Sequence, residues 1–339
     1  MKSYIYRYSI YPHRFDKRDF YYLNSGKKRV KPDKSTLQYI QDLKIPPGYH
    51  PVKINLNKNA KILAIGIDKK GKSQYIYHPN WVKNREKSKQ SDMITFGKKI
   101  PKIKATIKKN ISQKEMSMDK LISIILQLII TCHFRVGNEI GKDLYDSYGL
   151  TTISKKQVKP TNKYVEIDFI GKSGVVNICK VVDSQLIDVL KNIHRERNNK
   201  ETFFTYKPRG KKFGRKITSK DVNKFLKQFG DFSSKNFRTW MANVEFIDEL
   251  LDNYNPKTKY SQNERKKLFR DALQATAEKL HHTPSICKKA YINQDLQNIF
   301  LDKPDKFNKL VYQIYHNKNN SNTSGYTRSE KAFMSFLHG

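Results

Sequence analysis

Tyr291 lies beside a histidine doublet and two lysines, a set of residue types that can carry out phosphoryl transfer. The segment from residue 280 to residue 292 reads LHHTPSICKKAYI, so His281 and His282 lie upstream of the tyrosine, and Lys288 and Lys289 lie just before Ala290 and the tyrosine. A tyrosine hydroxyl can attack a phosphodiester and hold the product covalently. Tyrosine occurs 20 times in the chain. Tyr291 therefore indicates this chemistry only if further phosphate-binding groups accompany it.

Two arginines and a lysine upstream are candidates for such groups. Arg135 follows an apolar stretch in FRVGNE, and Arg238 lies in SSKNFRTWMAN, where the serines predict a helix N-cap. The planar guanidinium of arginine suits two phosphate oxygens at once. Lys235 precedes Arg238 by about one helical turn, which places both cations on one helix face. Such cations repel each other unless an anion lies between them, and a phosphate would be that anion.

Lys172 is predicted to lie at the tip of a β-hairpin. Residues 164–170 alternate between apolar and polar, a turn follows at Gly171 to Gly174, and alternation resumes at 175–178. A lysine at a hairpin tip can swing while it stays tethered, as a proton donor to a leaving oxygen must. The two glycines lack the sequence and the strand-to-helix context of a P-loop, which argues against nucleotide binding.

The histidine doublet is separated from Tyr291 by Pro284, which interrupts any helix between them. The histidine and the tyrosine can therefore converge on one site without being neighbours on a helix. The residues alone leave open whether His281 or His282 would do so.

The elements that must position these groups divide into two kinds. Residues 1 to about 85 carry strand signals, as in 4–10, 52–56, 61–67 and 73–79, with one helix expected at Ser35 to Leu43. Beyond Asp119 the pattern is mainly helical, and the apolar run 121–134 predicts a buried helix. We therefore predict an α+β fold with a small β-rich domain at 1–88 and a larger, mainly α-helical catalytic domain at 89–339 that contains the hairpin. Its lysine-dense start, 84–114, is expected to be a basic connector that leads into the helices.

The charge of the chain favours a polyanionic partner. Lys and Arg total 67 against 31 Asp and Glu, giving a formal net charge of +36. A compact fold with this charge repels itself, so nucleic acid is the expected partner. An AT-rich genome that enriches lysine and asparagine is the alternative, but it does not explain the shortage of acids.

Cysteine spacing and hydropathy argue against several other classes of protein. Cys132, Cys179 and Cys287 are far apart and lack metal-ligand spacing, so we expect neither a disulfide framework nor a zinc site, and a reducing environment fits. The run 121–134 is shorter than the roughly 17 to 25 residues that a membrane span needs. The first residues, MKSYIYRYSIYPHRF, have no apolar signal core, so secretion is not expected.

Together these motifs, in this order, resemble the type IB DNA topoisomerases of the compact poxvirus and bacterial kind. The resemblance runs from about Ile45 to Ile292 and is carried by IPPGYHPV (45–52), GKSQYIYHPNW (71–81), FGKKIPKI (96–103), RVGNE (135–139), YGLTTI (148–153), FIGKSG (169–174), KNFRTWMAN (235–243) and HTPSICKKAYI (282–292).

The resemblance implies a role for each candidate in nicking and resealing one DNA strand. It makes Tyr291 the nucleophile, Arg135 and Arg238 the groups that hold the scissile phosphate, Lys172 the proton donor to the departing 5′ oxygen, and His282 a donor to a non-bridging oxygen. It also places Lys235 near the phosphate, and Gln74, Tyr75 and Tyr77 of the smaller domain on DNA. The 3′-phosphotyrosyl bond would conserve the energy of the phosphodiester, so religation would need no ATP. No carboxylate cluster for a divalent ion is visible, and we expect no metal or other cofactor.

Two other functions share parts of this pattern. Tyrosine recombinases share the catalytic fold, but they usually carry a histidine where this chain has Lys235, and their N-terminal domain is helical rather than β-rich. A basic DNA-packaging protein would bind DNA without a covalent adduct. The resemblance implies a monomeric, intracellular enzyme, with a virion or a viral replication site as the expected setting.

Overall fold

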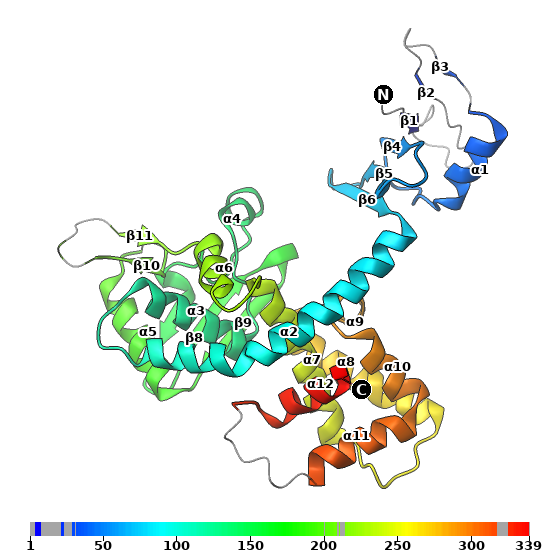
Figure 1. Cartoon of the computed structure of the whole chain (residues 1–339). Helices are drawn as coiled ribbons and strands as arrows, with labels where there is room; N and C mark the ends of the chain where they lie inside the picture. Colours follow the sequence, from blue (N-terminus) through cyan, green and yellow to red (C-terminus); the bar gives the residue numbers. More distant parts are fainter. Residues whose placement is uncertain are drawn as a thin grey trace. The chain divides into compact units, whose positions relative to one another are not determined.

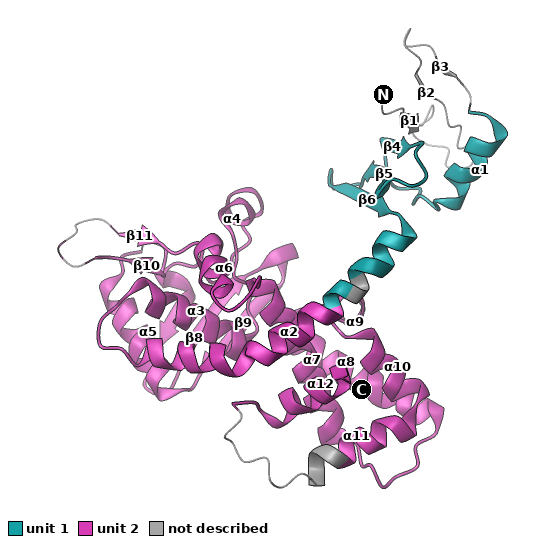
Figure 2. Ribbon diagram, in the orientation of Figure 1, with its two compact units in different colours: residues 1–89 teal, residues 90–339 magenta. Residues whose placement is uncertain are grey.

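The computed structural model describes residues 4–7, 22–23, 29–30, 32–199, 201–208, 210, 214–316 and 325–338. The chain divides into two compact units, residues 1–89 and residues 90–339 (Figure 2). The expected strand at 4–10 is described only over β1 (Tyr4–Arg7), because residues 8–10 lie outside the described part of the chain.

The smaller unit is built on an antiparallel sheet of four strands, in the order β1, β4, β5 and β6. Its further strands are β4 (Val52–Asn55), β5 (Ile62–Ile67) and β6 (Ser73–Tyr77), and a short pair consists of β2 (Tyr22–Leu23) and β3 (Arg29–Val30). Helix α1 (Lys34–Asp42) starts at the side chain of Asp33, which accepts a hydrogen bond from the Thr36 amide at 2.8 Å. Alternate residues of β4 face a small apolar core with Ile40 of α1. The strand and helix predictions for residues 35–77 are confirmed.

The expectation of a basic connector at 84–114 is wrong, because helix α2 (Pro79–Ile111) occupies almost all of it. The large apolar residues stand singly among lysines, but they recur every three or four positions, which is the spacing of one helix face. Those in the larger unit are buried: Met93, Phe96, Ile100, Ile103, Ile107 and Ile111. The density of lysine concealed this periodicity.

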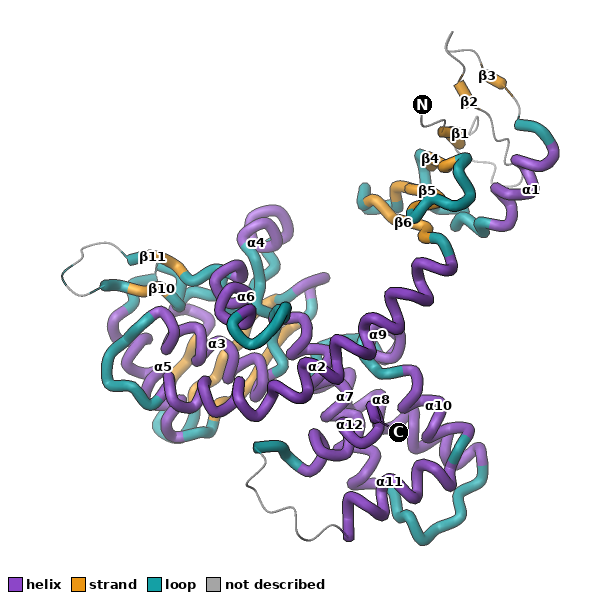
Figure 3. Tube along the Cα trace, viewed as in Figure 1, coloured by secondary structure: helices purple, strands orange, loops and turns teal. Residues whose placement is uncertain are grey.

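The larger unit is mainly helical and holds one three-stranded antiparallel sheet (Figures 1 and 3). Its helices are α3 (Met118–Cys132), α4 (Glu139–Tyr145), α5 (Ser184–Glu196), α6 (Ser219–Lys227), α7 (Ser234–Asn253), α8 (Gln262–Lys279), α9 (Pro284–Ala290), α10 (Gln294–Asp302), α11 (Pro304–His316) and α12 (Arg328–His338). The sheet runs β7 (Val158–Pro160), β8 (Val165–Ile170) and β9 (Val176–Val181), and a short hairpin pairs β10 (Thr205–Tyr206) with β11 (Arg215–Lys216). The α+β fold class is confirmed.

Helices α3 and α7 form the interior of this unit. The expected apolar helix is α3, of which ten residues are buried, and α7 packs against α3, α6, α8 and α12. Trp240 of α7 is fully buried and lies edge-on to Phe96. Burying apolar surface in this way stabilises the fold by about 25 cal/mol for each Å² that is removed from water. Both helices are therefore firmly held, which makes them suitable carriers for a site. None of the helices in the described residues is long and apolar enough to cross a membrane.

The expectation of no disulfide is also wrong. Cys132, the last residue of α3, is bonded to Cys179 of β9, with their Cα atoms 5.7 Å apart. The pairing depends on the packing of α3 against β9, which spacing along the chain cannot reveal. The bond ties the end of α3 to the predicted hairpin, which β8 and β9 form as expected.

The disulfide should contribute measurably to stability. Its two cysteines are 47 positions apart, and closing a loop of this length stabilises a fold by about 4 kcal/mol in the chain-entropy description. Replacing both residues (Cys132→Ser with Cys179→Ser) should lower the free energy of urea unfolding by up to this amount. Reductant should lower the urea midpoint of unfolding of the parent protein and leave the midpoint of the double variant unchanged. An unchanged midpoint for the parent would contradict the bond.

Candidate active site

The candidate site is centred on Arg238, which lies in the second turn of α7 and is only 7% exposed. Helix α7 begins at Ser233 in a capping box with Asn236, which confirms the predicted serine cap. The guanidinium donates to three acceptors: the carbonyl of His133, the carbonyl of Leu280, and Nε2 of His282, which lies 3.1 Å from Arg238 Nε. None of the ion pairs among the described residues includes this arginine.

The two carbonyls come from the ends of two helices. His133 follows α3 and Leu280 follows α8, and the last carbonyls of a helix have no partner within it. A helix C-terminus also carries a partial negative charge of about half an electron. Two such ends stabilise the buried guanidinium without neutralising it as a carboxylate would. Its positive charge thus remains available to an anion.

Both turns contain a residue in a strained backbone conformation. His133 and His281 each have a φ of 54°, in the left-handed region. This conformation costs an L-residue other than glycine roughly 1–2 kcal/mol. The ring of His281 stacks on Phe134 with centroids 5.7 Å apart, so the two turns also rest on each other.

Tyr291 lies against the same cluster, at the end of α9. Its ring meets that of His282 edge-on, with centroids 4.8 Å apart, and the guanidinium carbon of Arg238 is 5.8 Å from the ring centroid. As expected, Pro284 starts a new helix and allows the histidine and the tyrosine to converge. The structure thus favours His282 over His281 as the histidine of the site.

Asn243 of α7, which is 1% exposed, holds the backbone around Tyr291. Its Nδ2 donates to the Tyr291 carbonyl at 2.9 Å, and its Oδ1 accepts from the Asn293 amide at 2.7 Å. Helix α7 therefore positions both the arginine and the tyrosine. Sequence reasoning did not single out Asn243, although an asparagine on the apolar side of a helix was a signal.

Arg135 belongs to the same electrostatic cluster. Burial, followed by the charge of Arg135, lowers the pKa of Arg238 to about 10, against an opposing contribution from the hydrogen-bonded Tyr291. Burial, followed by the charges of Arg238 and Arg135, lowers the pKa of His282 to about 3. His282 is therefore neutral near pH 7. Since its Nε2 accepts from Arg238, the proton lies on Nδ1, which is buried without a hydrogen-bond partner among the described residues.

The loop that carries Arg135 is fixed by two glycines in close contact. A Cβ on Gly149 would lie 2.5 Å from Cα of Gly137 and 2.8 Å from the Arg135 carbonyl. Only glycine at both positions allows this approach. The Leu150 amide donates to the Arg135 carbonyl at 3.0 Å.

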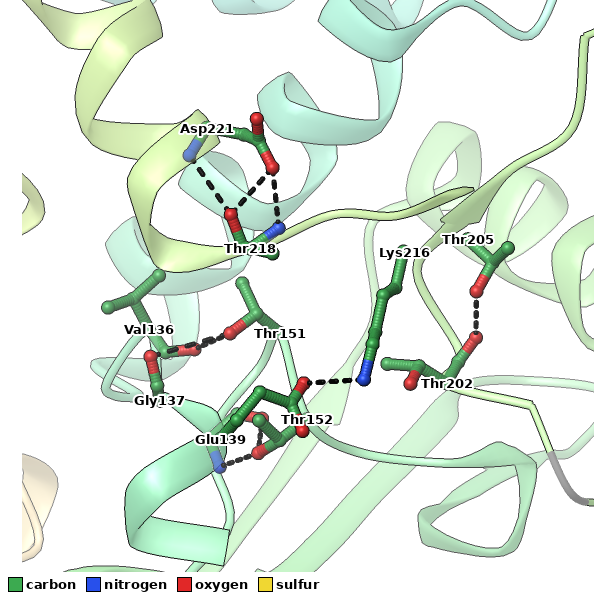
Figure 4. Close-up of polar contacts among 11 residues, drawn as sticks. Val136, Gly137, Glu139, Thr151, Thr152, Thr202, Thr205, Lys216, Thr218 and Asp221 are labelled. Atoms are coloured by element: carbon green, nitrogen blue, oxygen red, sulfur yellow. Dashed lines mark hydrogen bonds and ion pairs between the residues drawn. The ribbon is translucent and has the colours of Figure 1, made fainter. Parts of the chain in front are cut away.

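Side-chain contacts reinforce this loop (Figure 4). The Thr151 hydroxyl donates to the Val136 carbonyl at 2.9 Å, and Glu139 at the start of α4 lies 3.3 Å from Lys216 of β11. The loop is thus bound to the segment after α4 and to the β10–β11 hairpin. Arg135 therefore lies on a braced backbone, although α4 itself is short.

The two candidate lysines are exposed and make no described contact with Tyr291. Lys172 lies at the turn between β8 and β9, as predicted, where Ser173 has a φ of 67°. The buried Asn177 side chain donates to the Val175 carbonyl at 2.8 Å and braces this turn. Lys235 lies in the first turn of α7. The structure therefore brings Arg135, Arg238, His282 and Tyr291 together, but not these lysines.

In the smaller unit, the candidates Gln74, Tyr75 and Tyr77 lie on β6. Gln74 donates to Asp68 at 2.8 Å. Tyr75 is 48% exposed and stacks towards Tyr77 at 6.1 Å, and Tyr77 stacks on Trp81 at 4.3 Å. Such a row of aromatic rings offers flat surfaces for contact with a polyanion and its bases.

Two cations extend the aromatic row in this unit. Nζ of Lys61 lies 4.7 Å from the Trp81 ring centroid and the guanidinium carbon of Arg85 lies 5.0 Å from it. Sequence reasoning did not single out these residues. In the described part of the chain, no group of three His, Cys, Asp or Glu side chains is arranged to hold a metal ion.

Comparison with known proteins gives consistent matches. The catalytic core of eukaryotic DNA topoisomerase I matches residues 78–320, and the N-terminal domain of bacterial DNA topoisomerase IB matches residues 19–68. The chain is 28% identical over 295 residues to DNA topoisomerase 1B of Acanthamoeba polyphaga mimivirus, covering 86% of this chain and 87% of the relative. It is 27% identical over 242 residues to DNA topoisomerase 1 of Rabbit fibroma virus (strain Kasza), covering 69% and 70%. Identity to DNA topoisomerase 1B of Vaccinia virus (strain Copenhagen) is 24% over 279 residues, covering 81% and 85%.

The lowered pKa of His282 predicts an acid-dependent loss of stability. The folded pKa is about 3 and that of an unfolded histidine about 6.5, so between these values the unfolded chain binds a proton that the folded chain does not. The free energy of unfolding should therefore fall as the pH falls below about 6.5. Between pH 7 and pH 5, the free energy of unfolding should fall by about 1 kcal/mol less in His282→Gln than in the parent. This figure includes a reduction for the partial solvent exposure of the histidine. Urea unfolding at both pH values measures this, with the exposed His338→Gln as control. Equal losses in the parent and in His282→Gln would refute it.

Proposed function

Because the chain belongs to the DNA topoisomerase I family, in its type IB form, we propose that it relaxes duplex DNA through a transient bond between Tyr291 and the 3′ phosphate of one strand. The matches favour this activity over the tyrosine recombinases that share the constellation. The observation that carries the assignment of the site is the buried Arg238, which has no described carboxylate partner and lies beside Tyr291 and His282. A site of this kind is complementary to a phosphate and poor for any cation.

The reaction exchanges one phosphoester bond for another. The Tyr291 oxygen attacks the phosphorus and loses its proton to solvent water, while the bond from phosphorus to the 5′ oxygen breaks. Arg135 and Arg238 stabilise the extra negative charge on the non-bridging oxygens. The leaving 5′ oxygen takes up a proton from Lys172, whose exposed place on the hairpin lets it approach a bound strand. Rotation of the free end followed by the reverse reaction restores the strand without ATP.

His282 contributes as a neutral hydrogen-bond donor in this proposal. Its Nε2 accepts a hydrogen bond from Arg238, and its Nδ1 has no partner in the described part of the chain. A buried donor without an acceptor costs about 1–3 kcal/mol. A non-bridging phosphate oxygen that accepted a hydrogen bond from Nδ1 would remove this cost. Phosphate binding would thus complete a hydrogen-bond network that the free protein leaves open.

The remaining charged and aromatic residues would bind the duplex outside the cleavage site. We assign Gln74, Tyr75 and Tyr77 of the smaller unit to contacts with DNA, and Lys235 to a phosphate near the scissile one. The net charge of +36 supports an extended phosphate footprint, with binding that weakens steeply as salt rises. We propose that the enzyme acts as a monomer that clamps DNA, inside the cell, at a viral replication site or in a virion.

The proposal predicts relaxation of supercoiled plasmid in EDTA without ATP. Tyr291→Phe should abolish relaxation and yield no protein–DNA adduct after denaturation with SDS, because it lacks the attacking oxygen. Arg135→Ala and Arg238→Ala should each slow adduct formation on the order of 10²-fold or more. A gel that separates plasmid topoisomers measures the first effect and SDS trapping the second. Relaxation by Tyr291→Phe at the parental rate would exclude Tyr291 as the nucleophile, and no relaxation by the parent would exclude the function.

A further inference from the structure

Glu245 is a largely buried carboxylate on α7, two turns after Arg238, with a side chain that is 17% exposed. Its Oε1 lies 3.4 Å from Nε2 of His133, and its Oε2 accepts a hydrogen bond from Nζ of Lys279 at 2.9 Å. Burial raises the pKa of this carboxyl, but the bonds to His133 and Lys279 outweigh it and lower the pKa to about 2. Glu245 is therefore ionised at neutral pH, and the site described above makes no direct use of it.

The two partners of Glu245 belong to the two turns that hold Arg238. His133 supplies one of the carbonyls that accept from the guanidinium. Lys279 immediately precedes Leu280, which supplies the other. One carboxylate on α7 thus ties both carbonyl-bearing turns to the helix that carries the arginine.

The turns need such a tie, because both contain left-handed histidines. His133 and His281 each have a φ of 54°, and a strained backbone persists only where surrounding contacts fix it. On one side the turns meet through the stacking of His281 on Phe134. Glu245 also contacts both turns, through His133 in the first and through Lys279 just before the second.

We propose that Glu245 is a positioning residue for phosphoryl transfer, which fixes the two carbonyls that orient the Arg238 guanidinium toward the scissile phosphate. This inference rests on the proposed function. None of the described ion pairs joins Glu245 to Arg238, so the carboxylate orients the arginine without neutralising it. Loss of Glu245 leaves Arg238 in place but less well aligned, and small misalignments in a reacting site are costly.

Glu249 provides a matched control on the same helix. It lies one turn beyond Glu245, its side chain is 20% exposed, and its Oε1 lies 2.8 Å from the same Lys279 Nζ. It makes no described contact with His133 or Leu280. Glu249→Gln therefore removes an equivalent charge and an equivalent ion pair without releasing the His133 turn.

The test measures single-turnover cleavage of supercoiled plasmid, with enzyme in excess and SDS to trap the adduct. Glu245→Gln should slow cleavage about tenfold. In the Tyr291→Phe background, which cannot form the adduct, the same substitution should change plasmid affinity by less than about twofold. Glu249→Gln should stay within about twofold of the parent in both measurements. Glu245→Asp, which keeps the charge, should recover part of the loss.

A double-mutant cycle separates positioning from a general structural effect. In the Arg238→Ala background, Glu245→Gln should change the cleavage rate by less than about twofold, because the carboxylate acts through the arginine. An undiminished tenfold effect in that background overturns the proposal, as does equal slowing by Glu245→Gln and Glu249→Gln. If Glu245→Gln does not fold, Glu245→Asp serves in the same cycle. A parent that forms no adduct would instead refute the proposed function, which keeps the two failures distinct.

Discussion

The arrangement depends on one constraint, the burial of the Arg238 guanidinium without a carboxylate partner among the described residues. Burying a cation is costly unless it is fully hydrogen-bonded. Here the compensation comes from two main-chain carbonyls at the C-termini of α3 and α8, whose partial charges favour a cation without cancelling it. A carboxylate in the same place would stabilise the free protein better and would compete with phosphate. The fold thus stores a positive charge where a strand of DNA would present a negative one.

Much of the larger unit serves to hold that geometry. Helix α7 carries Arg238, Asn243 and Glu245. The helix therefore holds the arginine itself, the segment of Tyr291 through Asn243, and the two turns through Glu245. Helix α3 is buried along most of its length, which fixes the point from which Arg135 emerges. The contact between Gly137 and Gly149 closes the loop that follows. Residues that are far apart in the sequence lie within hydrogen-bonding distance of Arg238 because these helices are anchored in the core.

The elements with strong periodicity and the residues with distinctive chemistry could be predicted from the sequence. The strands at 52–77, the buried helix before Arg135 and the hairpin with Lys172 follow from alternation, apolar runs and turn residues. Two expectations were wrong for different reasons. The density of lysine in α2 concealed an apolar stripe that recurs every three or four positions, whereas the Cys132–Cys179 pair exists only because α3 packs on β9. The carbonyls of His133 and Leu280 could not be predicted, because a main-chain group carries no sequence signal.

The most direct measurement of the central claim is the site of covalent attachment. Plasmid incubated with the parent enzyme is denatured with SDS, trimmed with nuclease and digested with trypsin, and mass spectrometry locates the residual nucleotide. We expect a nucleotide joined through phosphate to Tyr291, in the peptide that follows Lys289. Attachment to any other residue would contradict the claim that the buried guanidinium of Arg238 directs phosphoryl transfer to this tyrosine.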